Sequence, residues 1–312
     1  MRADASHPEP GQPAAAETVR RLLAGALPLQ PGETAIDDSD PSSTTGQTPG
    51  FELPPGSHGG SMSLDIAPAL DGWSHDADRV CVRVIRGDDA LPKLQMRLDL
   101  GLLQMETAGR PDGLRPGGCV SLLSYHEARL DDHRRGEHRH DPLVLSPRDC
   151  RQLRDEADMY CRRLLGWFVL GEWELASADA RHVLLTIDFL AEQATEPGDR
   201  FSLHGCKPYV VMMQARAKAA LLVGDEQLST AVRVVESALR KLGRHFRQFG
   251  GQRAHRASAE VQTLRTLIRK LRKRVPVSPI KLMKRELRRA ISSENFERAA
   301  ELRDLLDSLK RS

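Results

Sequence analysis

The feature that most constrains the fold is a helical periodicity that runs from Ser146 almost to the end of the chain. Apolar residues recur there every three or four positions, which is the spacing of one-sided helices. Ser146-Pro147 has the residues of a helix start, with Asp149 placed as in a capping box, and glycines punctuate the pattern. The sequence predicts helices at about 147–170, 173–194, 207–223, 226–248 and 254–274.

An internal repeat lies at two of the corners between these helices. Gly171-Glu172-x-x-Leu175-x-x-Ala178 recurs fifty-three residues later as Gly224-Asp225-x-x-Leu228-x-x-Ala231. The form resembles tetratricopeptide repeats, in which a turn leads into an alanine-lined second helix, although the second copy needs two inserted residues. The sequence therefore predicts a helical-repeat domain over residues 146–275, stacked as a solenoid-like array.

The last thirty-five residues, 278–312, have the pattern of two short helices folded back on each other. Ser278-Pro279 repeats the start signal, and Asn295 or Ser293 can cap the second helix. Each helix has an apolar stripe, formed by Ile280, Met283, Leu287, Ala290 and Ile291 in the first and by Phe296, Ala299, Leu302, Leu306 and Leu309 in the second. Two helices of this length bury little surface, so the stripe needs a partner.

The string Phe296-Glu297-x-Ala299-Ala300-x-Leu302-Arg303-Asp304, preceded by Leu287, Ala290 and Glu294, resembles the UVR motif of the excision-repair proteins UvrB and UvrC. The motif also occurs in ClpC-type ATPases and in the McsA adaptor. The resemblance implies a protein–protein contact element that often pairs with another copy as a four-helix bundle. Its contact surface would include Phe296, Ala299, Ala300, Arg303 and Asp304, and the apolar stripe adds Leu287, Ala290, Leu302 and Leu306.

Other readings of the same residues stay open. Phe296 and the leucines could instead dock the hairpin on the preceding helices. What the relatives attach to the motif is absent, because the chain has neither a Gly-x-x-x-x-Gly-Lys-Ser/Thr phosphate loop nor the Cys-x-x-Cys pairs of the adaptor. ATPase and helicase activities are therefore excluded.

Composition bounds the fold class and the compartment. Charged residues make up 29% and aromatic residues 4%, which favours helices with aliphatic cores over a β-sandwich. The five cysteines are scattered and lack metal-site spacing, which indicates reduced thiols. No apolar run approaches about eighteen residues, and no basic stretch followed by an apolar core opens the chain. We expect a soluble, cytoplasmic protein without membrane contact.

Two segments precede the helices. Residues 1–78 contain ten Pro, nine Gly and eight Ser, and carry a net charge of −9, whereas the remainder carries +12. This composition predicts a disordered acidic tail over residues 1–77. In residues 78–145, apolar residues alternate around Val82, over Leu94–Leu100 and around Met105, which predicts a three-stranded antiparallel meander. A helix at about 121–134, or the long helix after it, would cover one face. The fold class is mainly α with a small α+β unit.

Two candidate reactive sites are weak. Histidines and carboxylates crowd residues 126–141, and both are zinc ligands. However, His126 and His133 lie about two helical turns apart, and three nearby arginines repel a cation. Cys119 and His126 would lie about 10 Å apart on a helix, beyond hydrogen-bond reach. We predict no metal, no cofactor and no catalytic residue, and hence no enzyme.

A basic tract is the main competitor to protein binding. Residues 240–289 hold seventeen Lys and Arg against two Asp and Glu. Such a stripe could bind nucleic acid non-specifically and with a strong salt dependence. No aromatic residues interleave the part of the tract from Arg265 to Arg288 to stack on single-stranded bases. The candidate phosphate contacts are Arg265, Arg269, Lys270, Arg272, Lys273, Arg274, Lys284 and Arg288.

The sequence therefore predicts a non-enzymatic adaptor that binds another protein through its terminal hairpin. The partner would be a UVR-containing protein or a second copy of the chain. The alternative is a nucleic-acid-associated accessory of DNA repair that uses the 240–289 stripe.

Overall fold

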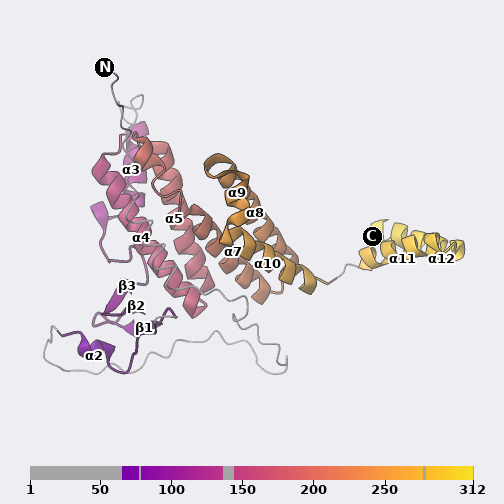
Figure 1. Ribbon diagram of the computed structural model, residues 1–312, viewed down its shortest axis with the longest axis horizontal. Coiled ribbons are helices and arrows are strands. Elements are labelled where there is room, and N and C mark those ends of the chain that lie inside the picture. The colour runs from indigo at the N-terminus through magenta and orange to yellow at the C-terminus, as the bar shows by residue number, and fades with distance from the viewer. Residues whose placement is uncertain (1–64, 77–78, 136–143, 277–278, 312) are drawn as a thin grey trace, which may run out of the picture.

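The computed structural model describes residues 65–76, 79–135, 144–276 and 279–311, and Figure 1 shows a small sheet, a body of helices and a terminal hairpin in that order. Most of the predicted acidic tail, residues 1–64, lies outside the described residues. Of the residues that are described, no helix is both long and apolar enough to span a bilayer.

The sheet is the predicted antiparallel meander, in the order β1-β2-β3. Its strands are β1 (Val82–Arg86), β2 (Pro92–Arg97) and β3 (Leu102–Glu106). Val84 pairs with Leu94, and Leu94 pairs in turn with Met105, so the alternating apolar residues share one face. The alternation predicted a strand to Leu100, but the backbone turns after Arg97, and the N–H of Leu98 donates to the carbonyl of Gly101 at 2.8 Å.

The long helix α4 (Pro147–Leu170) covers the apolar face of the sheet. Leu94 is fully buried against it, and a Cβ built on Gly166 would lie 2.5 Å from the Leu94 Cδ2. A larger residue at position 166 would therefore force the Leu94 side chain to move where the helix and the central strand approach. Of the two covers that the sequence left open, α4 lies on the strands, whereas α3 (Leu122–Arg135) packs on α4.

The opposite face of the sheet is met by residues 65–76, which include the short helix α2 (Ala67–Leu70). Arg83 donates to the carbonyl of Ala69 at 2.7 Å, and its guanidinium lies 4.0 Å from the centroid of the Trp73 ring. Arg97 donates to the carbonyl of Trp73 at 3.0 Å. The end of the segment assigned to the tail is therefore ordered by contacts with the sheet.

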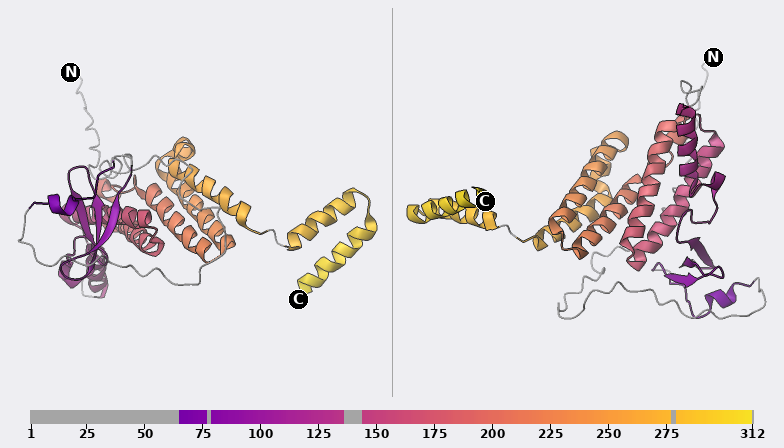
Figure 2. Two further views of the ribbon diagram at one scale, coloured as in Figure 1. Left: turned by 90° about the horizontal axis from the view of Figure 1, so that it is seen from below. Right: turned by 180° about the vertical axis from the view of Figure 1, so that it is seen from behind.

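The body consists of helices that follow one another along the chain (Figures 1 and 2). After α4 come α5 (Trp173–Gln193), α6 (Pro197–Arg200), α7 (Lys207–Gly224), α8 (Leu228–Phe249), α9 (Gly251–Ala257) and α10 (Ala259–Arg274). The sequence predicted one helix over 254–274, but the chain breaks at Ser258. The Ser258 hydroxyl accepts from the N–H of Val261 at 3.2 Å and so caps α10 as a separate helix.

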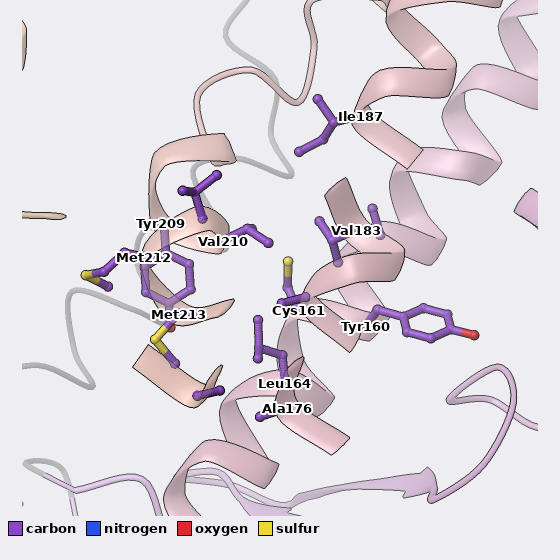
Figure 3. Close-up of a cluster of buried hydrophobic side chains, with 14 of the residues drawn as sticks. Tyr160, Cys161, Leu164, Ala176, Val183, Ile187, Tyr209, Val210, Met212 and Met213 are labelled. Atoms are coloured by element: carbon purple, nitrogen blue, oxygen red, sulfur yellow. The ribbon is translucent and has the colours of Figure 1, made fainter. Parts of the chain in front are cut away.

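Helix α7 is the centre of the body, because it packs on α5, α8 and α10. Its residues from Pro208 to Ala215 are all buried. Figure 3 shows Val210 of α7 gathered with Val183 and Ile187 of α5 and with Leu164 of α4. The apolar and alanine-rich sequence of α7 lets its neighbours approach closely from several sides.

Three corners of the chain share one backbone geometry, at α4–α5, α7–α8 and between the terminal helices α11 (Pro279–Ser292) and α12 (Phe296–Arg311). Each corner has one left-handed residue with φ of 78°, 59° and 55°, namely Gly171, Glu226 and Glu294. The N–H of the following residue donates to the carbonyl five positions earlier, at 2.9, 2.7 and 2.9 Å. This is the hydrogen bond of a Schellman motif. The alanine five positions after each left-handed residue is buried: Ala176, Ala231 and Ala299.

These corners correct the register of the sequence repeat. Glu226, rather than Gly224, occupies the position of Gly171, which accounts for the two inserted residues. The helical-repeat arrangement is present, but its second corner uses a non-glycine residue in a left-handed conformation. Such a residue costs roughly 1–2 kcal/mol relative to glycine.

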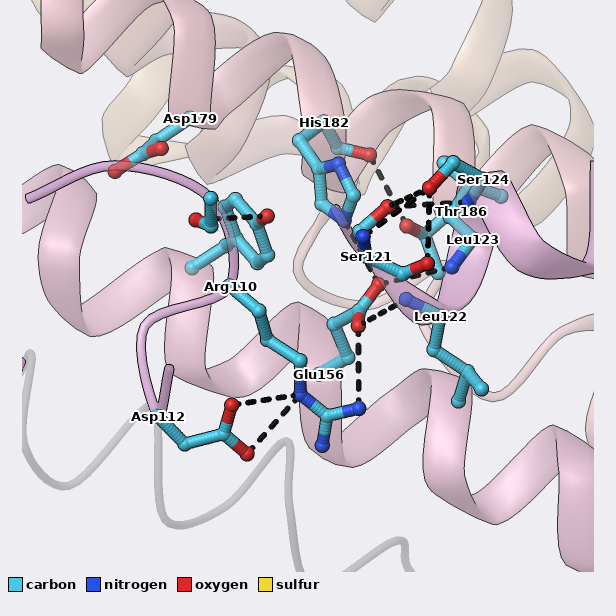
Figure 4. A network of polar contacts seen from close by, with 12 residues as sticks. Arg110, Asp112, Ser121, Leu122, Leu123, Ser124, Glu156, Asp179, His182 and Thr186 are labelled. Atoms are coloured by element: carbon cyan, nitrogen blue, oxygen red, sulfur yellow. Dashed lines mark hydrogen bonds and ion pairs between the residues drawn. The ribbon is translucent and has the colours of Figure 1, made fainter. Parts of the chain in front are cut away.

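Buried polar groups of α4 hold the α+β segment on the body. Glu156 is fully buried, and its carboxylate accepts from the N–H groups of Leu122 and Leu123 at 2.7 and 3.1 Å. His182 Nε2 lies 3.0 Å from the same carboxylate, and Arg110 Nη1 lies 3.5 Å from it (Figure 4). Glu156 therefore binds the first turn of α3, a loop after β3 and helix α5 together.

Arg163, about two turns after Glu156 on α4, has a similar role. Its guanidinium pairs with the buried Asp179 of α5 at 2.7 Å. It also donates to the carbonyls of Glu106 and Gly109 at 2.8 Å each. The sheet segment and the helices also share one continuous hydrophobic cluster, which extends across the predicted boundary at residue 145.

The first prediction concerns Glu156. Glu156→Ala leaves buried N–H groups of α3 unpaired and should lower the free energy of unfolding by about 3 kcal/mol. Glu156→Gln keeps an acceptor oxygen and should cost about 1–2 kcal/mol. Urea unfolding followed by circular dichroism measures both, and equal stability of Glu156→Ala and wild type would contradict the role.

The same residue predicts a pH dependence. Burial alone would raise the pKa of Glu156, but the hydrogen bonds from His182, Leu122 and Leu123 outweigh it and lower the pKa below its ordinary value of 4.5. The stabilisation by the carboxylate is therefore complete above about pH 4.5 and is lost as the pH falls through the folded-state pKa. As the pH falls below about 4.5, the difference in the free energy of unfolding between wild type and Glu156→Gln should therefore become smaller.

The second prediction concerns the corner at Glu226. Glu226→Gly removes the strain of a positive φ and should raise the free energy of unfolding by about 0.5–1 kcal/mol. The matched control is Asp225→Gly, because Asp225 has a φ of −82° and gains nothing from glycine. Denaturant midpoints compare the two, and a loss of stability in Glu226→Gly as large as that in the control would exclude the assigned corner register.

Candidate protein-interaction site

The terminal hairpin is formed by α11 and α12, which turn at the left-handed Glu294. Asn295 caps the second helix, because its side-chain oxygen accepts from the N–H of Arg298 at 3.1 Å. The other candidate cap, Ser293, instead donates to the carbonyl of Ala290 at 3.2 Å. The cap and the Schellman hydrogen bond together fix where α12 begins.

Four residues of the predicted apolar stripe are buried inside the hairpin. Leu302 and Leu306 are only 2% and 4% exposed, and Ala290 and Ala299 are also buried, with Leu287 half-buried beside them. None of the buried four belongs to the hydrophobic cluster of the body. These residues therefore hold α11 and α12 together as a separate small core.

The outer face of α12 carries the remaining predicted contact residues. Phe296 is 69% exposed, and Ala300, Arg303 and Asp304 are exposed as well. Because Phe296, Ala300 and Arg303 follow one another at four and three residues, they share one side of the helix. Arg303 Nε and Asp304 Oδ1 lie 3.9 Å apart with both side chains mostly in water.

The hairpin is not docked on the body through this face. Figures 1 and 2 show α11 and α12 packed on each other and apart from the other helices. Three further large apolar side chains of the hairpin are exposed: Leu282, Ile291 and Leu305. A ring as exposed as that of Phe296 contradicts the alternative in which it anchors the hairpin to the preceding helices.

The candidate phosphate contacts fall on two separate helices. Six are exposed on α10, whose apolar side packs on the body: Arg265, Arg269, Lys270, Arg272, Lys273 and Arg274. The other two, Lys284 and Arg288, are exposed on α11. Arg272 is engaged with Glu236 of α8 at 2.8 Å. The stripe therefore divides between the body and the hairpin rather than forming one surface.

The weak reactive sites have ordinary surroundings. His126 is 1% exposed with its ring 5.2 Å from Tyr125, and burial lowers its pKa. Among the described residues, no three His, Cys, Asp or Glu side chains are placed to hold a metal ion. The predicted candidates from 137 to 141 lie outside the described residues. Burial also raises the pKa of the Cys150 thiol to about 11, so it stays protonated at neutral pH.

One group of side chains has no counterpart in the sequence analysis. Phe201 and His204 meet His245 and Phe249 in a cluster of rings near the C-terminal end of α8. The two pairs come from distant segments, and neither segment has an aromatic repeat. In the sequence, His245-Phe246 followed by Phe249 was a partial signal of an aromatic cluster. Only the fold places Phe201 beside these residues.

Comparison with known families bears on the hairpin alone. Residues 278–312 match the family model of the UvrB/uvrC motif. No curated protein and no solved structure matches the chain, so the tetratricopeptide resemblance of the body is not confirmed. The motif indicates a role in protein interaction or one associated with DNA repair. The chain thus carries a UvrB/uvrC motif, and the helical hairpin of α11 and α12 is that motif.

Proposed function

We propose that the protein is a non-enzymatic, cytoplasmic adaptor that binds another protein through the outer face of α12. The observation that carries the proposal is the Phe296 ring, 69% exposed on a capped helix whose inner side is already filled. A large aromatic side chain held in this way is the usual anchor of a protein interface.

The energetics favour a partner over solvent. A phenylalanine side chain can bury on the order of 150 Å² or more, which at about 25 cal/mol per Å² is a gross gain of several kcal/mol before the costs of association are subtracted. The hairpin is closed before the partner arrives, since Leu302 and Leu306 are buried within it. Binding therefore costs less ordering entropy than the folding of a free segment would.

The charges beside the ring suggest the chemistry of the partner. Arg303 and Asp304 stand next to each other on the exposed side of α12. A second helical hairpin with the same pair, related by a two-fold axis, can set each arginine against the other's aspartate. The proposed partner is accordingly a UVR-containing protein or a second copy of this chain.

The polar groups of the body support a role without catalysis. Glu156 and Asp179 are committed to holding α3, α4 and α5 together. Burial raises the pKa of the Cys161 thiol, which removes it as a nucleophile. The body would then act as a rigid platform that carries the hairpin.

The third prediction tests the anchor. Phe296→Ala should weaken association by about 2 kcal/mol, or roughly 30-fold in Kd, because it removes the ring from the centre of the interface. Sedimentation of the full chain measures self-association, and titration with an immobilised UVR hairpin from an excision-repair protein measures the heterologous case. Circular dichroism checks that the hairpin stays folded.

Leu305→Ala is the matched control. Leu305 is another exposed apolar residue of α12, 50% exposed, and lies about half a turn round the helix from Phe296. We expect a much smaller effect from it. Equal affinities of wild type and Phe296→Ala, or no association of the full chain in either assay, would refute the proposal.

A further inference from the structure

The rings near the end of α8 form a contiguous cluster, here called the ring cluster: Phe201, His204, His245 and Phe249. The centroids of His204 and Phe249 lie 4.3 Å apart, and those of Phe201 and Phe249 lie 5.6 Å apart. His245 lies 5.2 Å from Phe249. The cluster joins the segment between α6 and α7 to the C-terminal turn of α8.

Two features distinguish the ring cluster from ordinary core packing. Its phenylalanines face water, with Phe201 45% and Phe249 39% exposed. Both ring nitrogens of His204 are buried and, within the described residues, have no hydrogen-bond partner. The cluster therefore has exposed aromatic surface on a support of half-buried histidine rings.

The histidines add no positive charge at neutral pH. Burial, together with Lys207 and His245, lowers the pKa of His204 to about 4. Burial and Lys207 also lower the pKa of His245. Lys207 itself is paired with Asp188 at 2.7 Å, which is the carboxylate that faces this group. The exposed surface of the cluster is thus neutral and aromatic.

The surroundings of the ring cluster are strongly basic. Residues 237–259, which contain the end of α8 and all of α9, hold six Lys and Arg and no Asp or Glu. All six are exposed, and none forms an ion pair within the described part of the chain: Arg240, Lys241, Arg244, Arg247, Arg253 and Arg256. Uncompensated like charges favour a polyanionic ligand.

We propose that the ring cluster and the neighbouring cations bind single-stranded nucleic acid. Unpaired bases stack on the exposed rings of Phe201 and Phe249, while Arg253 and Arg256 of α9 contact phosphates. The rings select a single strand, because the base faces of a duplex are covered by their neighbours. An acidic peptide would use the cations but would leave the aromatic surface unused.

The fourth prediction uses the full-length chain and a labelled oligodeoxythymidylate of about twenty nucleotides, followed by fluorescence anisotropy. Phe249→Ala and Phe201→Ala should each weaken its binding roughly 5- to 100-fold, since each removes a stacking platform. Binding of a duplex of the same length should change little. Arg253→Ala and Arg256→Ala should instead weaken both nucleic acids and reduce the salt dependence.

Two controls separate stacking from misfolding and from protein binding. Phe249→Trp keeps an aromatic face and should retain binding even if Phe249→Ala loosens α9. Phe296→Ala alters the other exposed ring, on the hairpin, and should leave oligonucleotide affinity unchanged while it weakens protein association. The two proposals can therefore fail separately.

Three results would overturn the inference. They are no binding of the oligonucleotide at low salt, wild-type affinity in both phenylalanine-to-alanine variants, and an equal loss on single strand and duplex. The last result would leave a surface that acts through charge alone.

Discussion

The carboxylate of Glu156 is the contact on which the arrangement of the first half of the structure depends. A fully buried charge is costly unless it is paired, and here the first turn of α3, His182 and Arg110 all satisfy it. These groups come from three separate segments of the chain. Together with Arg163, which ties the loop after β3 to α5, Glu156 makes α4 the common element of the sheet and the helices.

Periodicity identified the elements because it reflects burial directly. The period-two pattern around Leu94 and the helical pattern from Ser146 both predicted elements of the correct type and in the correct order. Backbone geometry at the corners was less visible. Glu226 adopts a left-handed conformation because the Schellman hydrogen bonds of the corner require it, and nothing about a glutamate signals that. The sequence repeat was consequently aligned on Gly224.

Other errors arose where a local pattern could not reveal its partner. The composition of residues 65–76 resembles that of a tail, but contacts of Ala69 and Trp73 with Arg83 and Arg97 order the segment. In the hairpin, the three-and-four spacing grouped Phe296 with Leu302, but spacing does not determine which side of α12 meets α11. The structure buries Leu302 and leaves Phe296 outside. Non-local packing decides all of these features.

The separation of the hairpin from the body has a consequence for how the two exposed aromatic surfaces act. The hairpin core consists of two alanines and two leucines with half-buried neighbours, and it shares no buried residue with the cluster of the body. So small a core is only marginally stable, and a partner that binds the folded hairpin adds stability by mass action. The ring cluster, in contrast, rests on α8, whose apolar side belongs to the main core. Occupancy of Phe296 should therefore stabilise the hairpin, whereas occupancy of Phe249 should stabilise the main core.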